Sequence, residues 1–510
     1  MSRLLPLSLL LLFAASVSAQ VVPPVAITID VNDRVGPDRL ALVHFTVENT
    51  SDQPLTHVRL EMSTGFGSDI QDVSADDAAA TCSQVSPDFT GISCTFPLLA
   101  PHAKATATTT TQFAPGHYNL TLEVRASSTG LKDASRVVTF YREFSVTTPA
   151  NEGPGSFRQA ILDSNAQCPT GTPCRISFEI PDAPTAEGWF TIALASPLPA
   201  ILGAEITIDG ERQTAITGDT NPRGPEVFLD GRAVTIADGL LFNGVTATVR
   251  GLAIGGFPGN GILVLKSKPI IQNNDIGVDP TGTVPVPNGL RGIMGDGFNA
   301  EISGNVLSHN RRSGLFLWHG ANIHDNRIES NGASGMFLGG LTVFDSDIVI
   351  DNVITGNHDF GIALADKGSF EIRANTIAHN GGGGIDVGLN GRTPRIETFA
   401  GTLATPRVTS ARYDAASGDT IIEGVVTEAA FSAVERTVFL YANHAVDADG
   451  FAEGERFLGA VPLGAGFAFS LRVHDDLRGL YVDGSLFVKR WDLVDLRGST
   501  EFGPPALVGD

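Results

Sequence analysis

The chain has 510 residues, and its 56 aspartates and glutamates outnumber its 34 lysines and arginines to give a formal net charge of −22. This length is too great for one ordinary core and predicts about two to four domains. The negative charge repels phosphate backbones and anionic lipid surfaces, which disfavours nucleic-acid binding. The 57 glycines, together with few helical patterns, favour an all-β chain.

The N-terminus predicts an export signal. Arg3 precedes an unbroken apolar run at 4–15, and the small-residue site Val17-Ser18-Ala19 follows it. These features are typical of a secretory signal peptide, here residues 1–19. The apolar run is too short to span a bilayer comfortably, and no later segment offers a long apolar stretch. We therefore expect an extracellular or cell-surface protein, or a periplasmic one, that does not insert into a membrane after signal removal.

The four cysteines form two pairs that are close in sequence: Cys82 with Cys94, and Cys168 with Cys174. In an oxidising compartment, local disulfides are the natural interpretation of such spacing. The pairs lie too far apart, and lack the neighbouring histidines, to indicate a zinc site.

Residues 20–148 alternate apolar and polar positions in short runs such as "ALVHFTVENTSDQPLTHVRLEM", separated by turn signals. This pattern predicts a β-sandwich. The stretches "FTVENTSDQPLTHVRL" and "CTFPLLAPHAKATATTTTQF" resemble the secreted, immunoglobulin-like DUF11 repeat. The resemblance implies an adhesive or spacer module without catalytic groups of its own.

The segment "GPGSFRQAILDSN" resembles the Ser-Leu-Arg-Glu-Ala-Ile motif that precedes the repeats of bacterial secreted right-handed β-helix proteins, although Phe157 and Gln159 replace the usual Leu and Glu. Phe157, Ala160 and Ile161 can share one helical face, which predicts a short helix capping a solenoid. Further along, "NDIGVDPTGTVPVPNGLRGI" resembles a loop that recurs in the same proteins. Both resemblances are specific for architecture and weak for activity.

A repeat fills the middle of the chain. Its template is a hydrophobic residue, Asn three positions later, a hydrophobic residue two later, Asn three later and Gly-hydrophobic four later. Copies begin at Ile302, Ile323, Val349 and Ile372, and partial copies begin at Val249 and Ile271. A repeat of about 20 to 25 residues is typical of a solenoid.

Two solenoids compete for this pattern. A leucine-rich repeat wants an aliphatic residue where the first asparagine of each copy stands, and it needs a helical or irregular return. Here the return is a second alternating strand, as in Leu315-Phe316-Leu317 and Met336-Phe337-Leu338. The first and third residues of each triplet then point inward and the middle one outward. Short strands joined by tight turns predict a parallel β-helix at 149–404.

The asparagines have a structural explanation. Coils of a β-helix lie about 4.8 Å apart, and asparagine tolerates the left-handed backbone of a sharp corner. When such residues stack, each amide donates to one neighbouring coil and accepts from the other. We therefore predict a structural ladder of Asn305, Asn326, Asn352 and Asn375.

Residues 405–510 again predict a sandwich. The stretch "VFLYANHAVDADGFAEGERFLGA" is similar to a module that often follows such β-helices, although a cysteine common near Val446 is missing. Its acidic residues Asp447, Asp449, Glu453 and Glu455 form a candidate calcium site. Gly450 is wrongly placed for an EF-hand loop, so a solvated acidic loop is the alternative. No other cofactor is expected.

Three groups on the repeat are candidates for chemistry or binding. Asp325 and Asp351 precede the corner asparagines of adjacent coils, and His324 lies beside Asp325. Carboxylates so close can raise one pKa or recruit a cation, as acid–base sites do. The alternative is that both acids form surface ion pairs with Arg327 and Arg373.

The other two groups are aromatic and basic. Phe316 and Phe337 take the outward position of the same strand in successive coils, and Trp318 shares their parity. Exposed aromatics in such a row can bind sugar rings, or can be buried by another part of the chain. The basic residues on the same coil as Trp318 would suit an acidic sugar; they are Arg311, Arg312 and His319.

The sequence thus predicts an all-β protein: a right-handed parallel β-helix (solenoid) flanked by two β-sandwich domains. Extracellular binding or structural presentation is the preferred function, with a polysaccharide or cell-surface glycan as partner and no nucleic acid. The alternative is a carbohydrate-active enzyme, a polysaccharide lyase or glycoside hydrolase using the solenoid groove near His324, Asp325 and Asp351. A mechanical spacer is the third class.

Overall fold

The computed structural model describes residues 25–28, 34–35 and 39–509, apart from 65–67, 85–90, 115–118, 126–133, 169, 203–204, 245, 267, 297–298, 341–345, 366–368, 392–394, 399–400, 428–433, 449, 465 and 491–495. The expected signal peptide at 1–19 lies outside these residues. The chain divides into two compact units, Met1–Phe140 and Tyr141–Asp510.

The N-terminal unit is built from two antiparallel sheets. The first has the order β1 (Val25–Thr28), β2 (Leu40–Asn49), β7 (Lys104–Gln112) and β4 (Asp69–Ala75). The second has the order β5 (Thr81–Gln84), β6 (Gly91–Leu99), β3 (Leu55–Thr64), β8 (Asn119–Arg125) and β9 (Ala134–Thr139). Apolar residues from both sheets, among them Val43, Leu60 and Phe96, are fully buried in one core. Alternation along each strand therefore produces the expected sandwich.

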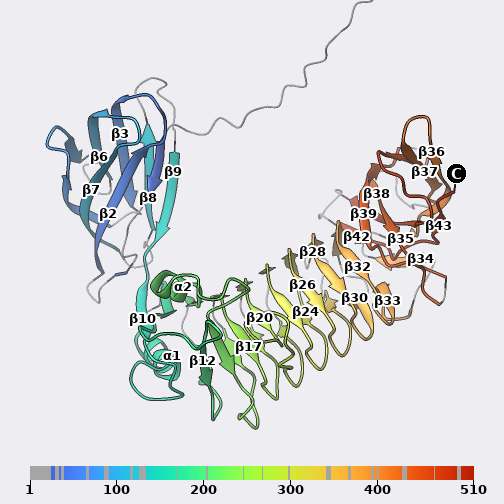
Figure 1. The fold of residues 1–510 in the computed structure, drawn as a ribbon, viewed down its shortest axis with the longest axis horizontal. Coiled ribbons are helices and arrows are strands. Elements are labelled where there is room, and N and C mark those ends of the chain that lie inside the picture. The colour runs from blue at the N-terminus through green and yellow to red at the C-terminus, as the bar shows by residue number, and fades with distance from the viewer. Residues whose placement is uncertain are drawn as a thin grey trace, which may run out of the picture. The chain divides into compact units, whose positions relative to one another are not determined.

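The middle of the second unit is a parallel β-helix with three sheets (Figure 1). The nine-stranded sheet has the order β10 (Arg142–Val146), β11 (Cys174–Phe178), β13 (Glu205–Asp209), β16 (Thr246–Arg250), β19 (Lys268–Gln272), β22 (Ala300–Ser303), β25 (Ala321–His324), β28 (Ser346–Ile350) and β31 (Ser369–Arg373). The eight-stranded sheet has the order β12 (Phe190–Ala193), β14 (Val227–Asp230), β17 (Ala253–Gly255), β20 (Asp275–Ile276), β23 (Val306–Ser308), β26 (Arg327–Glu329), β29 (Val353–Thr355) and β32 (Thr376–Ala378). The seven-stranded sheet has the order β15 (Leu240–Asn243), β18 (Ile262–Leu265), β21 (Ile293–Gly295), β24 (Leu315–Trp318), β27 (Met336–Gly339), β30 (Phe360–Ala365) and β33 (Gly383–Val387).

Register fixes which side chains stack. Ile302 pairs with Ile323, and Ile323 with Val349, so the apolar positions of each copy form one inward column. Leu315 and Leu317 likewise point inward, whereas Phe316 between them is half-buried on the outer face. The period-two alternation of each short strand therefore buries one side of every coil. This confirms the predicted all-β fold with its solenoid.

The N-terminal end of the solenoid carries a helix. In α1 (Phe157–Gln167), Phe157, Ala160 and Ile161 are buried in the solenoid core, and the Ser156 side chain accepts a hydrogen bond from the Gln159 amide as the N-cap. A second helix, α2 (Glu211–Thr217), follows β13. Strand β10 pairs in parallel with β11, so the solenoid begins upstream of the boundary expected at residue 149.

The C-terminal sandwich packs on the other end of the solenoid (Figure 1). It contains β36 (Arg407–Asp414), β37 (Asp419–Val425) and β40 (Ala468–Val473) in one sheet. The other sheet contains β39 (Arg456–Pro462), β38 (Val434–Asn443), β41 (Tyr481–Arg490), β42 (Leu496–Ser499) and β43 (Ala506–Leu507). Between solenoid and sandwich lies the hairpin of β34 (Arg395–Thr398) and β35 (Gly401–Ala404).

This sandwich closes all three sheets of the solenoid. The Ser499 hydroxyl accepts from the Ile372 amide of the nine-stranded sheet, and the Gly454 carbonyl accepts from Ile377 of the eight-stranded sheet. Glu501 accepts from the Val387 amide of the seven-stranded sheet. Phe439, Tyr441, Phe487 and Phe502 join the solenoid core. The final coil therefore has partners for backbone amides that would otherwise be left open.

The corners differ from expectation in one respect. The left-handed residue is the one before each ladder asparagine: Gly304 has φ 65°, Asp325 and Asp351 have φ 56°, and Ala374 has φ 56°. Aspartate and glycine tolerate this conformation better than most residues. The asparagines themselves are therefore selected for hydrogen bonding.

The predicted disulfides Cys82–Cys94 and Cys168–Cys174 are both present. Within the described part of the chain, neither helix is long and apolar enough to cross a bilayer.

Candidate functional site

The first asparagine of each copy forms a ladder along one corner. Nδ2 of Asn305 donates to Oδ1 of Asn326 at 3.0 Å, Asn326 donates to Asn352 at 3.0 Å, and Asn352 donates to Asn375 at 2.9 Å. Asn274 donates to Asn305 in the same way. Each backbone amide also donates to the next Oδ1, as from Asn305 to Asn326 at 3.0 Å. All these side chains are buried, so the ladder satisfies polar atoms that water cannot reach.

The second asparagine of each copy forms a parallel ladder along another corner. It runs from Asn288 through Asn310, Asn331 and Asn357 to Asn380. Its last member donates from Nδ2 to Oε2 of Glu453 at 2.9 Å, and the Asn380 amide also donates to this carboxyl group at 3.1 Å. Glu453 is buried. An acceptor from the C-terminal sandwich therefore ends the ladder.

This contact changes the interpretation of the acidic loop. Glu453 is engaged by Asn380, whereas Glu455 bonds to His444 at 2.7 Å. Asp447 lies at a turn, with its amide donating to the Phe451 carbonyl, and Asp449 lies outside the described residues. No group of three or more His, Cys, Asp or Glu side chains among the described residues could hold a metal ion. Among the described residues of this loop, Glu453 and Glu455 therefore have different partners, and the calcium site stays a prediction.

The candidate catalytic residues lie on the nine-stranded sheet and its corner. His324 Nδ1 lies 2.7 Å from Asp325 Oδ2, and His324 Nε2 lies 2.5 Å from Oε1 of Glu301. The hydrogen bond to Asp325, with a further one to Glu301, raises the pKa of His324 above its usual value. Glu301 also accepts from Asn322 at 2.9 Å. Both ring nitrogens are therefore engaged by carboxylates, which favours the protonated ring.

Asp351 is exposed on the next corner, because the register pairs His324 with Ile350. The arginines that were expected to pair with the two aspartates have other partners. Arg327 contacts Glu329, and Arg373 Nε lies 2.9 Å from Glu371. Both aspartates hold left-handed corner positions, which gives them a backbone role. The structure thus joins His324 with Asp325 and adds Glu301, but gives Asp351 no described partner.

The aromatic residues gather on the outer face of the seven-stranded sheet. Phe316 and Phe337 stack with ring centroids 4.5 Å apart and an interplanar angle of 8°. Trp318 meets both rings edge-on, at 5.7 Å from Phe316 and 5.6 Å from Phe337. A Cβ placed on Gly339 would come within 2.3 Å of the Trp318 ring, so the indole lies over that glycine. One face of each phenylalanine ring is therefore covered by the other ring, and the Trp318 indole contacts Gly339 in the next coil.

A basic cluster borders these rings. The Arg291 guanidinium lies 4.1 Å from the centroid of Phe316, a cation–π contact. Burial and the charge of Arg312 lower the pKa of Arg291 from its usual value. Arg311 and Arg312 are exposed, and the amide of His319 donates to Gly339 at 2.8 Å. Arg291 therefore places a positive charge against the rings, with Arg312 close enough to act on it electrostatically.

Two of these residues, Arg291 and Glu301, were not predicted from the sequence. Arg291 lies just before β21, in a copy of the repeat interrupted by a loop, so its place beside Phe316 depends on the length of that loop. The position of Glu301 can be read from the repeat, because it immediately precedes Ile302. The register therefore aligns it with Asn322 in the next coil.

Comparison with known proteins supports the architecture. Residues 238–398 match a family model described as right handed beta helix region. No curated protein sequence matches the chain.

Three solved structures show weak likeness. The catalytic unit of a family 87 α-1,3-glucanase from Streptomyces thermodiastaticus strain HF3-3 is 11% identical, with a TM-score of 0.20, over 71% of this chain and 92% of that one. A cohesin module from a family 33 glycoside hydrolase of Clostridium perfringens is 11% identical, with a TM-score of 0.18, over 23% and 97%. A family 20 exo-β-N-acetylglucosaminidase from Vibrio harveyi is 16% identical, with a TM-score of 0.15, over 23% and 17%. At these scores the likenesses carry no functional argument.

Proposed function

We propose that this protein is an exported binding protein that recognises an acidic glycan through the outer face of the seven-stranded sheet. The observation that carries the proposal is the contact between Trp318, the Phe316–Phe337 stack and the Arg291 guanidinium. Aromatic surface beside fixed cations suits a sugar ring that bears a carboxylate or sulfate. The two disulfides are compatible with an extracellular location.

Trp318 is the expected stacking residue. The stack covers one face of each phenylalanine ring, and the Arg291 guanidinium covers the other face of Phe316. The indole contacts Gly339 and is half-buried, so a pyranose ring can lie on the part of the indole that stays exposed. Arg311 and Arg312 then supply bidentate donors for the anionic group. Binding by this route should weaken as salt concentration rises.

A carbohydrate-active enzyme is the second candidate, and the contact of His324 with Glu301 and Asp325 is the observation that favours it. A general base needs a ring nitrogen free to take a proton. Here both nitrogens are hydrogen bonded, and the bond to Asp325, with a further one to Glu301, raises the pKa of His324 and so favours the charged ring. The arrangement therefore fits a structural ion cluster better than an acid–base pair.

An array of acidic and neutral oligosaccharides tests the proposal on the purified full-length protein. We expect acidic glycans to bind, with Trp318→Ala lowering affinity by about tenfold or more, as loss of a stacking anchor does. Arg312→Ala should weaken binding and flatten its dependence on salt. The matched control is Val353→Ala, an exposed apolar residue on a different sheet, which should leave affinity unchanged.

Three results would count against it. If no acidic glycan binds, a mechanical spacer becomes the better description. Glycan binding that survives Trp318→Ala would place the site elsewhere. New reducing or unsaturated ends released from a polysaccharide, and lost with His324→Gln, would establish the enzyme instead.

A further inference from the structure

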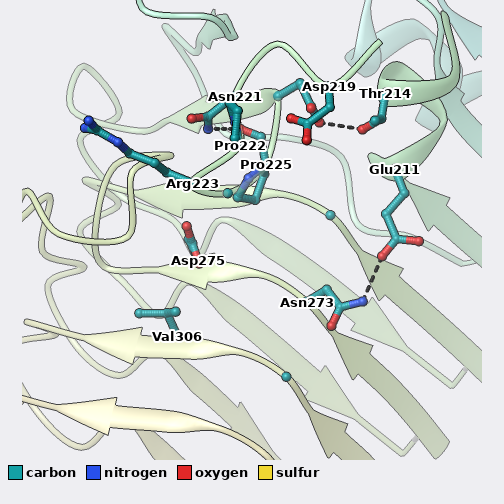
Figure 2. Close-up of a pocket in the computed structure, with 14 residues that line it drawn as sticks. Glu211, Thr214, Asp219, Asn221, Pro222, Arg223, Pro225, Asn273, Asp275 and Val306 are labelled. Atoms are coloured by element: carbon teal, nitrogen blue, oxygen red, sulfur yellow. Dashed lines mark hydrogen bonds between the residues drawn. The ribbon is translucent and has the colours of Figure 1, made fainter.

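A pocket lies above the eight-stranded sheet, whereas His324 belongs to the nine-stranded sheet and the aromatic residues to the seven-stranded sheet. It has a volume of about 430 Å³ and is formed by the loop at 219–226, helix α2 and the outer faces of β20 and β23. Figure 2 shows Asp275 rising from its strand towards the loop that carries Arg223 and Pro225. Register places Asp275 in the outward column of the sheet, between Ala253 and Val306.

Asp275 is the unusual residue of this pocket. Its side chain is only 6% exposed, yet its Oδ2 atom has no hydrogen-bond partner among the described residues. A Cβ placed on Gly224 would lie 2.7 Å from that oxygen, so the glycine leaves room for the carboxyl group. Burying a polar atom without a hydrogen-bond partner lowers the free energy of unfolding. Because Asp275 lines the pocket, a ligand bound there can supply a contact to this carboxyl group that the described residues do not.

The remaining polar groups define what that contact can be. Donors in the lining are already used: Nδ2 of Asn221 donates to the Pro225 and Pro280 carbonyls at 2.9 Å and 2.8 Å, Nδ2 of Asn273 donates to Glu211 at 2.9 Å, and the Thr214 hydroxyl donates to Glu226 at 2.6 Å. Oxygen acceptors therefore dominate the free polar surface. A complementary ligand must supply hydrogen-bond donors.

Charge excludes two ligand classes. Glu211, Asp219, Glu226 and Asp275 line the pocket, and Figure 2 shows Arg223, the one cationic residue of the described lining, extending away from the other labelled side chains. These carboxyl groups repel an anion. A metal ion is disfavoured because the described residues hold no group of three or more suitable ligands. A neutral ligand and an organic cation remain, and the apolar sides of Pro222, Pro225 and Val306 favour a neutral ring over a compact cation.

We infer that this pocket binds an uncharged, hydroxyl-rich ligand, a neutral saccharide unit, with the Asp275 carboxyl group as its innermost contact. Sugar hydroxyls donate to acceptors, and the apolar sides of Pro222, Pro225 and Val306 give a surface for the ring. Burial raises the pKa of Asp275 to about 7, and the charges of Arg327 and Asp279 act on it in opposite directions. The inference stands on this sheet alone and does not depend on the aromatic face.

The test uses the full-length protein and an array of neutral cello-, xylo-, malto- and chito-oligosaccharides, followed by calorimetry on the strongest binder. Val306→Trp fills the pocket from its outer side and should weaken binding by about tenfold or more, the equivalent of losing one good contact. Val353→Trp is the matched control. Val353 lies two strands along in the same outward column and outside the pocket lining, so affinity should stay within about twofold.

Asp275→Ala separates a binding role from a structural one. Because the carboxyl group is buried without a partner for Oδ2, its removal should raise the thermal midpoint while it weakens saccharide binding about tenfold. A structural role predicts a lower midpoint. Absence of any neutral saccharide binding, or binding that Val306→Trp and Asp275→Ala both leave intact, would overturn the inference. Trp318→Ala should not affect these ligands, so this site and the aromatic site can fail separately.

Discussion

At the scale of single residues, the solenoid is organised by small choices at its corners. Each coil needs a left-handed residue before the ladder asparagine, and aspartate, glycine and alanine all fill that position. The sequence pattern predicted the ladder but assigned the left-handed conformation to asparagine itself. The left-handed residue and the hydrogen-bonding asparagine are adjacent in every copy. The spacing of the repeat therefore cannot show which of the two has the left-handed backbone. Asp325 and Asp351 therefore have a backbone role at their corners, which the spacing alone does not reveal.

Asp275 predicts a measurable dependence of stability on pH. Its folded pKa of about 7 lies above its ordinary value of 3.8, because burial disfavours the charged carboxylate. Between these values the folded protein holds a proton that the unfolded chain releases, so the free energy of unfolding falls as pH rises and levels off above about pH 7. The contribution lost between pH 5 and 8 is about 2 to 3 kcal/mol.

Urea denaturation of the wild type and Asp275→Asn at pH 5, 6.5 and 8 checks this. The asparagine variant cannot ionise, so its stability relative to the wild type should grow between pH 5 and about 7 and then level off. A constant difference between the two proteins across this range would contradict the assignment of the shift to Asp275.

At the scale of elements, strand pairing depends on polar columns as much as on the apolar core. The first and second ladders run along two corners, and among the described residues only the second ladder reaches a partner in the C-terminal sandwich. Replacing Glu453 by alanine leaves the Asn380 backbone N–H without its acceptor and removes one acceptor of Nδ2, which keeps its bonds to the Ile354 and Ala378 carbonyls. An unsatisfied buried donor costs about 1 to 3 kcal/mol, so we expect a loss of that size in unfolding free energy.

Glu455→Ala is the matched control, since this acid bonds to the exposed His444. Surface pairs contribute at most about 1 kcal/mol. Chemical denaturation should therefore rank the wild type and Glu455→Ala close together and well above Glu453→Ala. Equal effects of the two substitutions would show that the ladder gains nothing from its last acceptor. Glu453→Gln retains one acceptor oxygen and should lie between them.

How far the sequence predicts these elements depends on whether they repeat. The strands around Ile302, Ile323, Val349 and Ile372 follow directly from the spacing, because every copy restates the same rule. Glu453 gave no such signal: it lies in one loop of a non-repeating domain, and its pairing with Asn380 spans many residues of sequence. The stacking of Arg291 on Phe316 also depends on a single loop. Features built once, by tertiary contact, cannot be found by periodicity.

At the scale of the whole molecule, the C-terminal sandwich is part of the solenoid's fold. Its aromatic residues enter the same core, and its backbone and side chains close the last strand of each sheet. A chain that stops at residue 404 would expose Ile372, Ile385 and the open edges of three sheets. We expect it to aggregate or to lose its cooperative thermal transition, because a solenoid requires a closed end.

The matched comparison is a chain of residues 141–510, which retains one complete compact unit. It should remain monomeric by light scattering and unfold at a midpoint within a few degrees of the corresponding transition in the full chain. A chain ending at 404 that is as soluble and as stable would show that the solenoid does not need its cap.

The second ladder has a direction, and this bears on how the chain is assembled. Each asparagine donates its backbone N–H and one N–H of Nδ2 to Oδ1 of the asparagine in the following coil. A stack that stops at an asparagine therefore leaves these two donors without that acceptor. A further asparagine accepts these two hydrogen bonds with its Oδ1 atom and adds two donors of its own. Glu453 accepts them with carboxyl oxygens and has no side-chain N–H to donate. The second ladder therefore ends at this residue, and no donor of the described ladder remains at that corner for a further coil to satisfy.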